Sequence, residues 1–399
     1  MSRTAHETQP EPIAAMRIGC NAEGARRIAD PDTMSDLRFR RMNIHESTAQ
    51  YEAWAARHLP LLRADLDLKH QRMAEDRFAF LRATFYRWMQ RWPEACPALA
   101  RAPGVLAIGD LHVENFGTWR DAEGRLVWGI NDFDEACESP YAQDLVRLAA
   151  SALIAAQEGH LDIVPHAVCE AILGGYREAL AGGGRPFVLE EHHGWLRDLA
   201  VNVLRDPVRF WKKLGDLPAS KKGLPAGVEK LLAKDLPEPQ LPYRVVHRVA
   251  GLGSLGRPRY VALADWHGGF VAREAKGILP SACIWAQAKR GGDDTYLPAV
   301  WLHAVRCQDP FLRVAGKWLL RRLGPHCSRI ELSSLPRQKD EEHLLRAMGW
   351  ETANIHLGTR NAANKISRDL AARPREWLRE GAASMVECVS EDWRDWKRG

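Results

Sequence analysis

Apolar and polar residues follow a helical period over much of the chain. Across residues 51–92 the apolar side chains recur at three- and four-residue intervals, which predicts amphipathic helices with Arg82 and Arg87 on or beside the polar face. After Pro140 the same spacing predicts a helix that faces the core. Further helices are predicted over residues 163–180, 190–204, 310–323 and 339–357.

Short apolar runs of strand length interrupt the helical stretches. The runs at residues 105–108 and 126–130 are each followed by acidic residues. Runs at residues 245–250, 260–263 and 270–275 predict a small antiparallel sheet, and residues 329–332 have the pattern of another strand. The mixture predicts an α+β protein.

Composition excludes several classes of protein. The 399 residues are 46% hydrophobic and 27% charged, which is ordinary for a globular protein and excludes collagen, coiled coil and wholesale disorder. The net charge of +5 is spread along the chain, so nucleic-acid binding is not indicated. The eight cysteines include no C-x-x-C pair and are expected to be reduced thiols. No run approaches the ~18 apolar residues of a membrane span, and we expect a cytoplasmic protein.

Two polar motifs follow the first two predicted strands, GDLHVENFG at residues 109–117 and NDFDE at residues 131–135. Carboxylate and amide oxygens are ligands that magnesium prefers. In a kinase catalytic loop an Asp accepts the proton of the substrate hydroxyl, an Asn five positions later binds metal, and a second metal-binding Asp comes after the next strand. Asp110, Asn115 and Asp132 have this spacing.

A glycine-rich motif, GLGSLG, occupies residues 251–256, and a later strand ends at Lys276. A dinucleotide-binding turn requires a helix directly after its glycines, whereas residues 257–263 have the pattern of a strand. A kinase-type hairpin over phosphates, with a strand lysine to pair with them, fits better. The residues predicted to contact the nucleotide are Gly251, Gly253, Ser254, Gly256 and Lys276.

The order of these motifs differs from that of ordinary kinases, in which the glycine-rich loop and lysine come before the catalytic loop. Circular permutation explains the difference. The predicted helix at residues 342–356 then corresponds to the helix that usually leads into the catalytic loop, and the two ends of the core meet in space. We therefore expect a permuted, protein-kinase-like fold with two lobes.

The combined motifs resemble the bacterial domain-of-unknown-function family 2252. The resemblance spans roughly residues 69–357 and includes Arg82 upstream, the string DLVRL that begins at Asp144, and the string EAK that ends at Lys276. The catalytic half is also similar to the aminoglycoside phosphotransferase and choline kinase group, which carries the pattern HGDLHxxN…IDFD. Ile108 stands where those phosphotransferases have His.

The resemblance implies a role for each matched residue. It makes Asp110 the catalytic base, Asn115 and Asp132 the magnesium ligands, and Lys276 the lysine that pairs with phosphate. It leaves two roles open for Asp134, a second metal ligand or an anchor for its loop.

Other positions follow from the same resemblance. His112 occupies the place where protein kinases have a lysine near the transferred phosphate, and Asp144 resembles the residue that braces the backbone of the catalytic loop. The glutamate that should pair with Lys276 has two candidates, Glu274 and Glu331.

The expected function is ATP- and magnesium-dependent phosphoryl transfer to a hydroxyl of an unknown, small-molecule acceptor. A pseudokinase that binds nucleotide without transfer is one alternative, and a metal-dependent phosphoesterase built on Gly-Asp-x-His is another. Each motif also has a purely structural explanation: a polar turn, a bulged hairpin, or a solvated lysine at the end of a strand.

Five segments are expected along the chain. They are a flexible N-terminal arm at 1–45, a helical catalytic lobe at 46–214, a proline-rich linker at 215–242, a small β-rich nucleotide-binding lobe at 243–335, and C-terminal helices at 336–399 that pack on the catalytic lobe. The oligomeric state is left open.

Overall fold

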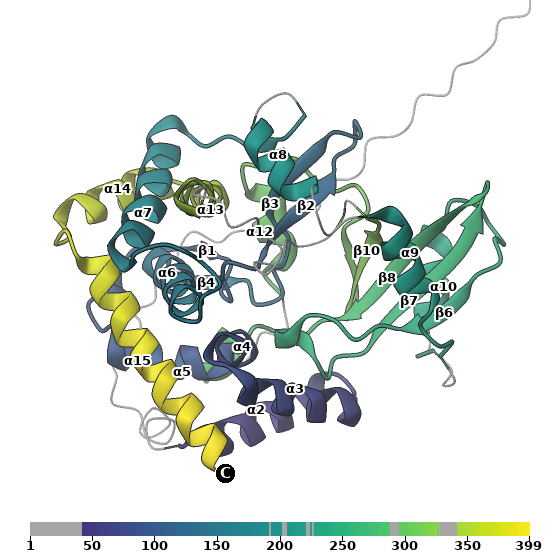
Figure 1. Ribbon diagram of the computed structural model, residues 1–399, viewed down its shortest axis with the longest axis horizontal. Coiled ribbons are helices and arrows are strands. Elements are labelled where there is room, and N and C mark those ends of the chain that lie inside the picture. The colour runs from purple at the N-terminus through teal and green to yellow at the C-terminus, as the bar shows by residue number, and fades with distance from the viewer. Residues whose placement is uncertain are drawn as a thin grey trace, which may run out of the picture.

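The computed structural model describes residues 42–190, 193–201, 206–220, 224–225, 227–287, 295–325, 327 and 341–399 (Figure 1). Most of the predicted arm at 1–45, the predicted strand at 329–332 and Glu331 lie outside these residues. The helices are α2 (Ile44–His58), α3 (Arg63–Glu75), α4 (Arg77–Ala83), α5 (Phe85–Ala95), α6 (Tyr141–Gln157), α7 (Pro165–Gly182), α8 (Gly194–Val201), α9 (Pro207–Gly215), α10 (Val228–Asp235), α11 (Ala282–Ala286), α12 (Leu297–His303), α13 (Glu341–His356), α14 (Ala362–Ala372) and α15 (Trp377–Arg398). The strands are β1 (Gly104–Ala107), β2 (Phe116–Arg120), β3 (Leu126–Ile130), β4 (Cys137–Pro140), β5 (Phe187–Val188), β6 (Arg244–His247), β7 (Arg259–Trp266), β8 (Gly269–Gly277), β9 (Arg313–Ala315) and β10 (Trp318–Leu323). This is the mixed α+β class that the sequence predicts.

The largest sheet has five antiparallel strands in the order β6-β7-β8-β10-β9, and with α9 and α10 it stands to one side of the other helices (Figure 1). One apolar cluster on this sheet includes Leu214 of α9 and Val261 of β7. A second cluster includes Leu232 of α10 and Ala262, the neighbour of Val261 on β7. Because neighbouring residues of a strand point to opposite faces, α9 and α10 cover the two faces of the sheet.

The segment at 215–242, predicted as a linker, therefore contributes to the core of the sheet. Val228 and Leu232 of α10 are buried against it, and Ala219 forms an isolated bridge with Val246. The prolines lie outside α10, which is why the composition of the segment is typical of a linker.

The helical part is built around α6, α7 and α13. Glycines let α7 and α13 approach closely: a Cβ at Gly175 would lie 1.8 Å from the Arg346 carbonyl oxygen, and one at Gly349 would lie 2.0 Å from that of Ile172. The long helix α15 packs along α6 (Figure 1). The small sheets β1-β4 and β2-β3-β5 lie between this helical core and the large sheet (Figure 1).

The predicted helix at 310–323 is wrong, because these residues form the hairpin of β9 and β10. Gly316 adopts a φ of +57° in the turn between the two strands, a conformation that favours glycine. Each residue of β10 then pairs with β8, from Trp318 opposite Gly277 to Leu323 opposite Ala272. Local apolar spacing predicted a helix, but pairing with a distant strand determines the structure.

Two arginines expected on or beside a polar helix face form ion pairs instead: Arg87 is buried and Arg82 is half-buried. Arg87 donates to both carboxylate oxygens of Asp392 at 2.9 Å, and Arg82 pairs with Glu114 at 2.7 Å. Ion pairing allows the burial.

The cysteines also depart from the expectation of reduced thiols. Cys137 of β4 and Cys283 of α11 form a disulfide with their Cα atoms 6.6 Å apart. The two cysteines are 146 positions apart in sequence, so no spacing rule could pair them. Within the described residues, none of the helices is both long enough and apolar enough to span a membrane.

Candidate functional site

The first polar loop, residues 108–115, is held by buried groups of α6 and α13. Asp144 of α6 accepts the N–H groups of Ile108 at 2.7 Å and Gly109 at 3.0 Å. The same carboxylate lies 3.0 Å from Nε2 of His356 at the end of α13, whose Nδ1 lies 2.7 Å from the Tyr176 hydroxyl. Asp144 thus braces the backbone of the loop as predicted. The His356 imidazole from α13 contacts Asp144, whereas position 108, where the similar phosphotransferases have His, is an isoleucine.

A glycine at position 109 allows the loop to reach its neighbour. Gly109 has a φ of +84°, and a Cβ there would lie 2.1 Å from the carbonyl oxygen of Glu135. Gln143 donates to the Gly109 carbonyl at 2.9 Å, and Ser151 accepts the Val113 N–H at 3.1 Å. Position 109 therefore admits no side chain, and α6 satisfies the polar backbone around it.

Asp110, the predicted base, is paired with a buried arginine. Arg147 of α6 donates to Asp110 Oδ1 from Nε at 2.9 Å and also from Nη2. Its guanidinium stacks on the rings of Phe85 and Trp88 and donates to the Leu81 carbonyl at 2.9 Å. Burial raises the pKa of Asp110 while Arg147 opposes the rise, and a raised pKa suits a carboxylate that accepts a proton near neutral pH.

The other predicted residues of the first polar loop bond to one another. Asn115 Oδ1 accepts the His112 N–H at 2.6 Å, and His112 Nδ1 accepts the Glu114 N–H at 3.2 Å. Glu114 in turn pairs with Arg82 of α4. These contacts fix the loop, and they occupy one lone pair of the Asn115 amide that was predicted to bind magnesium.

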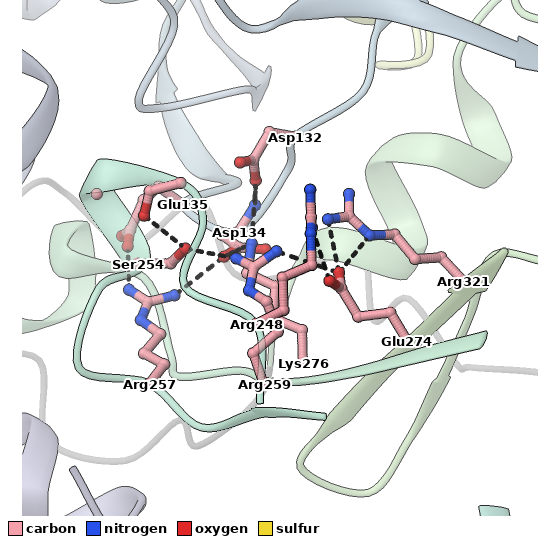
Figure 2. Close-up of polar contacts among 12 residues, drawn as sticks. Asp132, Asp134, Glu135, Arg248, Ser254, Arg257, Arg259, Glu274, Lys276 and Arg321 are labelled. Atoms are coloured by element: carbon pink, nitrogen blue, oxygen red, sulfur yellow. Dashed lines mark hydrogen bonds and ion pairs between the residues drawn. The ribbon is translucent and has the colours of Figure 1, made fainter. Parts of the chain in front are cut away.

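The acidic loop, residues 131–135, meets Lys276 of β8. Lys276 is 2% exposed and forms an ion pair with Asp134, and its Nζ lies 3.7 Å from Asp132 Oδ1 (Figure 2). Arg257 lies between the acidic residues, 3.2 Å from Asp134 Oδ2 and 2.7 Å from Glu135 Oε1. The lysine is therefore not a solvated strand end, and its ion pair with Asp134 joins the acidic loop to β8.

Charge and burial act differently on Asp132 and Lys276. Burial acts to raise the pKa of Asp132, but Lys276, Arg321 and Arg259 outweigh it and lower the pKa to about 2. Burial also lowers the pKa of Lys276, against the attraction of Asp132 and Asp134. Asp132 is 42% exposed, so an ionised carboxylate faces solvent at the edge of the cluster.

Glu274 is not the partner of Lys276, contrary to one of the two predicted pairings. It is fully buried and pairs with Arg248 at 2.8 Å, Arg259 at 3.1 Å and Arg321 at 2.6 Å (Figure 2). Residues two apart on a strand share a face, but Lys276 reaches out to the acidic loop while Glu274 meets arginines of β7, β10 and the loop after β6. Burial opposes ionisation of Glu274, yet Arg259, Arg321 and Arg248 hold its pKa well below the usual range.

The glycine turn, residues 251–256, lies directly on the first polar loop. A Cβ at Gly253 would lie 3.0 Å from the Arg82 carbonyl oxygen and 3.4 Å from Asp110 Oδ2. Lys69 of α3 reaches the Gly253 carbonyl at 3.5 Å. Burial lowers the pKa of Lys69 to about 8, so a second buried lysine joins the site.

The remaining turn residues have local roles. Ser254 donates to the Gly251 carbonyl at 3.2 Å and accepts from Arg259 at 2.8 Å. Gly256 has a φ of +94°, and a Cβ there would lie 2.4 Å from Leu66 Cδ2. The turn therefore requires glycine at Gly256 for both conformation and space.

One pocket joins the motifs. All of the predicted site residues except Gly256 and Lys276 line it, together with Lys69 and Arg257. Its volume is about 60 Å³, which is room for roughly four to six water molecules at 10–15 Å³ each. The motifs are thus in contact, with the glycine turn closed against the two loops.

The donor set suits a hard cation in part. Asp132 is exposed to solvent, and Asp134 Oδ1 is buried with no hydrogen-bond partner among the described residues. Carboxylates with one amide, completed by water and phosphate, are a magnesium-type donor set. The described parts of the chain contain no group of three His, Cys, Asp or Glu side chains close enough to bind a metal by themselves.

Several residues of the site were not singled out from the sequence. They are Lys69, Arg147, Glu135, Arg248, Arg257, Arg259 and Arg321. The only available signal was proximity to motifs: Arg147 lies within the DLVRL string, and Arg257 and Arg259 follow the glycine turn. Arg321 carried no local signal, because the pairing of β10 with β8 brings it to the site.

Comparisons with known proteins cover part of the site. Residues 61–193 match the family model described as an uncharacterized protein conserved in bacteria, DUF2252. This match supports the family resemblance for the segment that carries the first polar loop, the acidic loop and α6, and it ends before the glycine turn. No curated protein and no solved structure matches the chain.

Proposed function

We propose that this protein is an ATP- and magnesium-dependent phosphotransferase acting on a hydroxyl of a small-molecule acceptor. The underlying arrangement is a kinase-like pair of lobes in permuted order. The helical part with the two loops forms one lobe, and the sheet with the glycine turn and Lys276 forms the other.

One observation carries the proposal: motifs more than a hundred residues apart meet at one site. Lys276 Nζ lies 3.7 Å from Asp132 Oδ1, and Gly253 packs against Asp110. Nothing local in the sequence requires the glycine turn to close on the first polar loop and the acidic loop. Phosphoryl transfer does require a base, metal-binding oxygens, a phosphate cradle and a lysine in one place.

Each residue then has a role that its surroundings support. Asp110, with a raised pKa, would orient the acceptor hydroxyl and take its proton. Lys276 and the backbone of the glycine turn would hold the phosphates. Asp132, with Asp134 and Asn115, would hold Mg²⁺, which when bound offsets the phosphate charge.

The test is nucleotide binding and turnover by matched variants. We expect Mg²⁺·ATP to raise the melting temperature of the parent protein, and Asp132→Ala and Lys276→Ala to lose that rise. Asp110→Ala should retain binding but lose transfer by at least a hundredfold, in line with the 10²–10⁴-fold contribution of a general base. Glu138→Ala is the control, because Glu138 is exposed on β4 close to the acidic loop.

If Asp110→Ala and Asp132→Ala fold and turn over ATP as the parent does, the assignment is wrong. Absence of any nucleotide-dependent stabilisation would also remove the proposal.

The second candidate is a protein that binds nucleotide without transferring phosphate. It is favoured because the charged side chains predicted for catalysis already form ion pairs within the protein. Asp110 is held by Arg147, and Lys276 by Asp134. This candidate predicts ATP-dependent stabilisation that Lys276→Ala abolishes, with no hydrolysis or transfer across a panel of hydroxyl acceptors.

A further inference from the structure

Three arginines gather around one buried carboxylate beside the proposed nucleotide site. Arg259 of β7, Arg321 of β10 and Arg248 after β6 all pair with Glu274 (Figure 2). One carboxylate cannot neutralise three guanidinium groups, so two positive charges remain in excess around it. Asp132 and Asp134, which contact Lys276 beside the cluster, offset part of this excess.

The three arginines differ in how many of their hydrogen-bond donors are already bound within the protein. Arg259 is buried and donates to both Glu274 and Ser254. Arg248 donates to Glu274 through Nη1 alone, and Arg321 through Nε and Nη2. Their side chains are 29% and 25% exposed. Within the described residues, Nε and Nη2 of Arg248 and Nη1 of Arg321 make no hydrogen bond, so both side chains keep donors that Glu274 does not use.

Such an arrangement is suited to an oxyanion. Guanidinium groups present planar forks of donors that match phosphate oxygens. Because Glu274 holds the three groups before any ligand arrives, little conformational entropy is lost on binding. The cluster adjoins Lys276, since Glu274 and Lys276 share one face of β8, and Arg259 is opposite Lys276 in the sheet.

We propose that Arg248 and Arg321, held together with Arg259 by Glu274, form a phosphate-binding site for a second phosphate group of the ligand that Lys276 engages. The ligand then carries at least two phosphate groups. The inference rests on the proposed function for the placement of the first phosphate at Lys276, but the site itself requires no transfer reaction.

The test uses inorganic pyrophosphate and phosphate with the full chain, by isothermal titration calorimetry. We expect the parent to bind pyrophosphate more tightly than phosphate. Arg321→Gln and Arg248→Gln should each weaken pyrophosphate binding about tenfold, because a hydrogen bond to a charged group is lost. Arg322→Gln is the matched control: it removes the same charge from β10, but Arg322 contacts Phe311 and Arg120 on the other face of the sheet.

The outcomes separate this site from the proposed function. Loss of pyrophosphate binding in Arg321→Gln and Arg248→Gln, with Arg322→Gln unchanged, supports the site even if the parent transfers no phosphate from ATP. Equal binding in all variants, equal loss in Arg322→Gln, or no binding by the folded parent overturns it, whatever ATP turnover is found. Circular dichroism and melting temperature confirm that each variant is folded.

Discussion

At the scale of single residues, Arg147 is central to the site, because its guanidinium is fully buried and has one main charged partner. It pairs with Asp110 and lies over the rings of Phe85 and Trp88. Removing one member of a buried pair leaves the other without compensation, and this typically costs more than the pair itself contributes. The energetic role of Arg147 is therefore to make an ionised Asp110 tolerable in a closed site.

The prediction from this pair is that Arg147→Ala lowers the free energy of unfolding by about 3–5 kcal/mol. Urea unfolding of parent and variant measures the change. Arg346→Ala is the comparison, because Arg346 pairs with Glu178 on the surface, and exposed pairs contribute about 1 kcal/mol or less. Similar losses in the two variants would contradict the buried-pair argument.

Glu351 of α13 predicts a pH dependence of stability. It is 1% exposed, accepts the Ile130 N–H at 3.2 Å and the Asn354 amide at 2.8 Å, and burial raises its pKa to about 7. Between pH 4.5 and about 7 the carboxyl ionises in the unfolded chain but stays protonated in the folded one. Stability conferred by this group is complete below pH 4.5 and is lost as the pH rises through 7, by on the order of 3 kcal/mol.

Glu351→Gln should remove that slope, because an amide has the same shape and does not titrate. Urea unfolding at intervals from pH 4.5 to 8 in parent and variant measures it. The free energy of unfolding of the variant should increase relative to that of the parent as the pH rises. Parallel pH profiles of the two proteins would show that Glu351 is not the source of the pH dependence.

At the scale of elements, the glycine turn and the first polar loop are in contact, and Gly253 is the point of closest approach. A side chain there would meet the Arg82 carbonyl oxygen at 3.0 Å and Asp110 Oδ2 at 3.4 Å. Both neighbours are held by ion pairs, so the turn must move instead of the loop.

Gly253→Ala should therefore weaken Mg²⁺·ATP binding severalfold. It should change stability by less than about 1 kcal/mol, because Gly253 is only half-buried, has no positive φ, and a Cβ there would meet its nearest neighbour at 3.0 Å. Titration of parent and variant measures the affinity. Gly269→Ala is the matched control: it lies on β8, has no atom within 4 Å of its Cβ position and no positive φ. Unchanged ATP affinity in Gly253→Ala would argue against closure of the turn over a nucleotide.

What the sequence could predict depends on how local the determining contacts are. The helices α6 and α7 and the strands β7 and β8 follow from short-range periodicity and formed as expected. The hairpin β9-β10 did not, because its apolar spacing also suits a helix and only pairing with β8 distinguishes the two. The same holds for the site: Asp110, Asn115 and Asp132 had informative spacing, whereas the partners Arg147 and Arg321 lie on other elements.

At the scale of the whole molecule, connections between the helical part and the sheet determine whether the site exists. Arg257 of the glycine-turn segment bonds to Asp134 and Glu135 of the acidic loop. The backbone N–H of Ala282, just after β8, donates to Glu135 at 2.7 Å. Each of these contacts joins the sheet side to the loop side within a few residues of Lys276.

The Cys137–Cys283 disulfide is the covalent member of this set, since Cys137 lies two residues after Glu135 and Cys283 directly follows Ala282. It closes a loop whose ends are 146 positions apart and which contains α6 to α10 and β6 to β8. Cross-links across long loops reduce the freedom of the unfolded chain, and native disulfides typically contribute about 2–5 kcal/mol. The double variant Cys137→Ser, Cys283→Ser should lose about this much stability.

Reducing agent separates the contribution of the cross-link from that of the buried sulfur atoms. Urea unfolding of the parent with dithiothreitol should approach that of the double serine variant, which itself should not respond to reductant. Nucleotide-dependent stabilisation should survive in the variant at reduced melting temperature, because Arg257 and Glu135 still join the two sides. If the variant loses nucleotide binding while it remains folded, the disulfide positions the acidic loop against Lys276 and the ion pairs alone are insufficient.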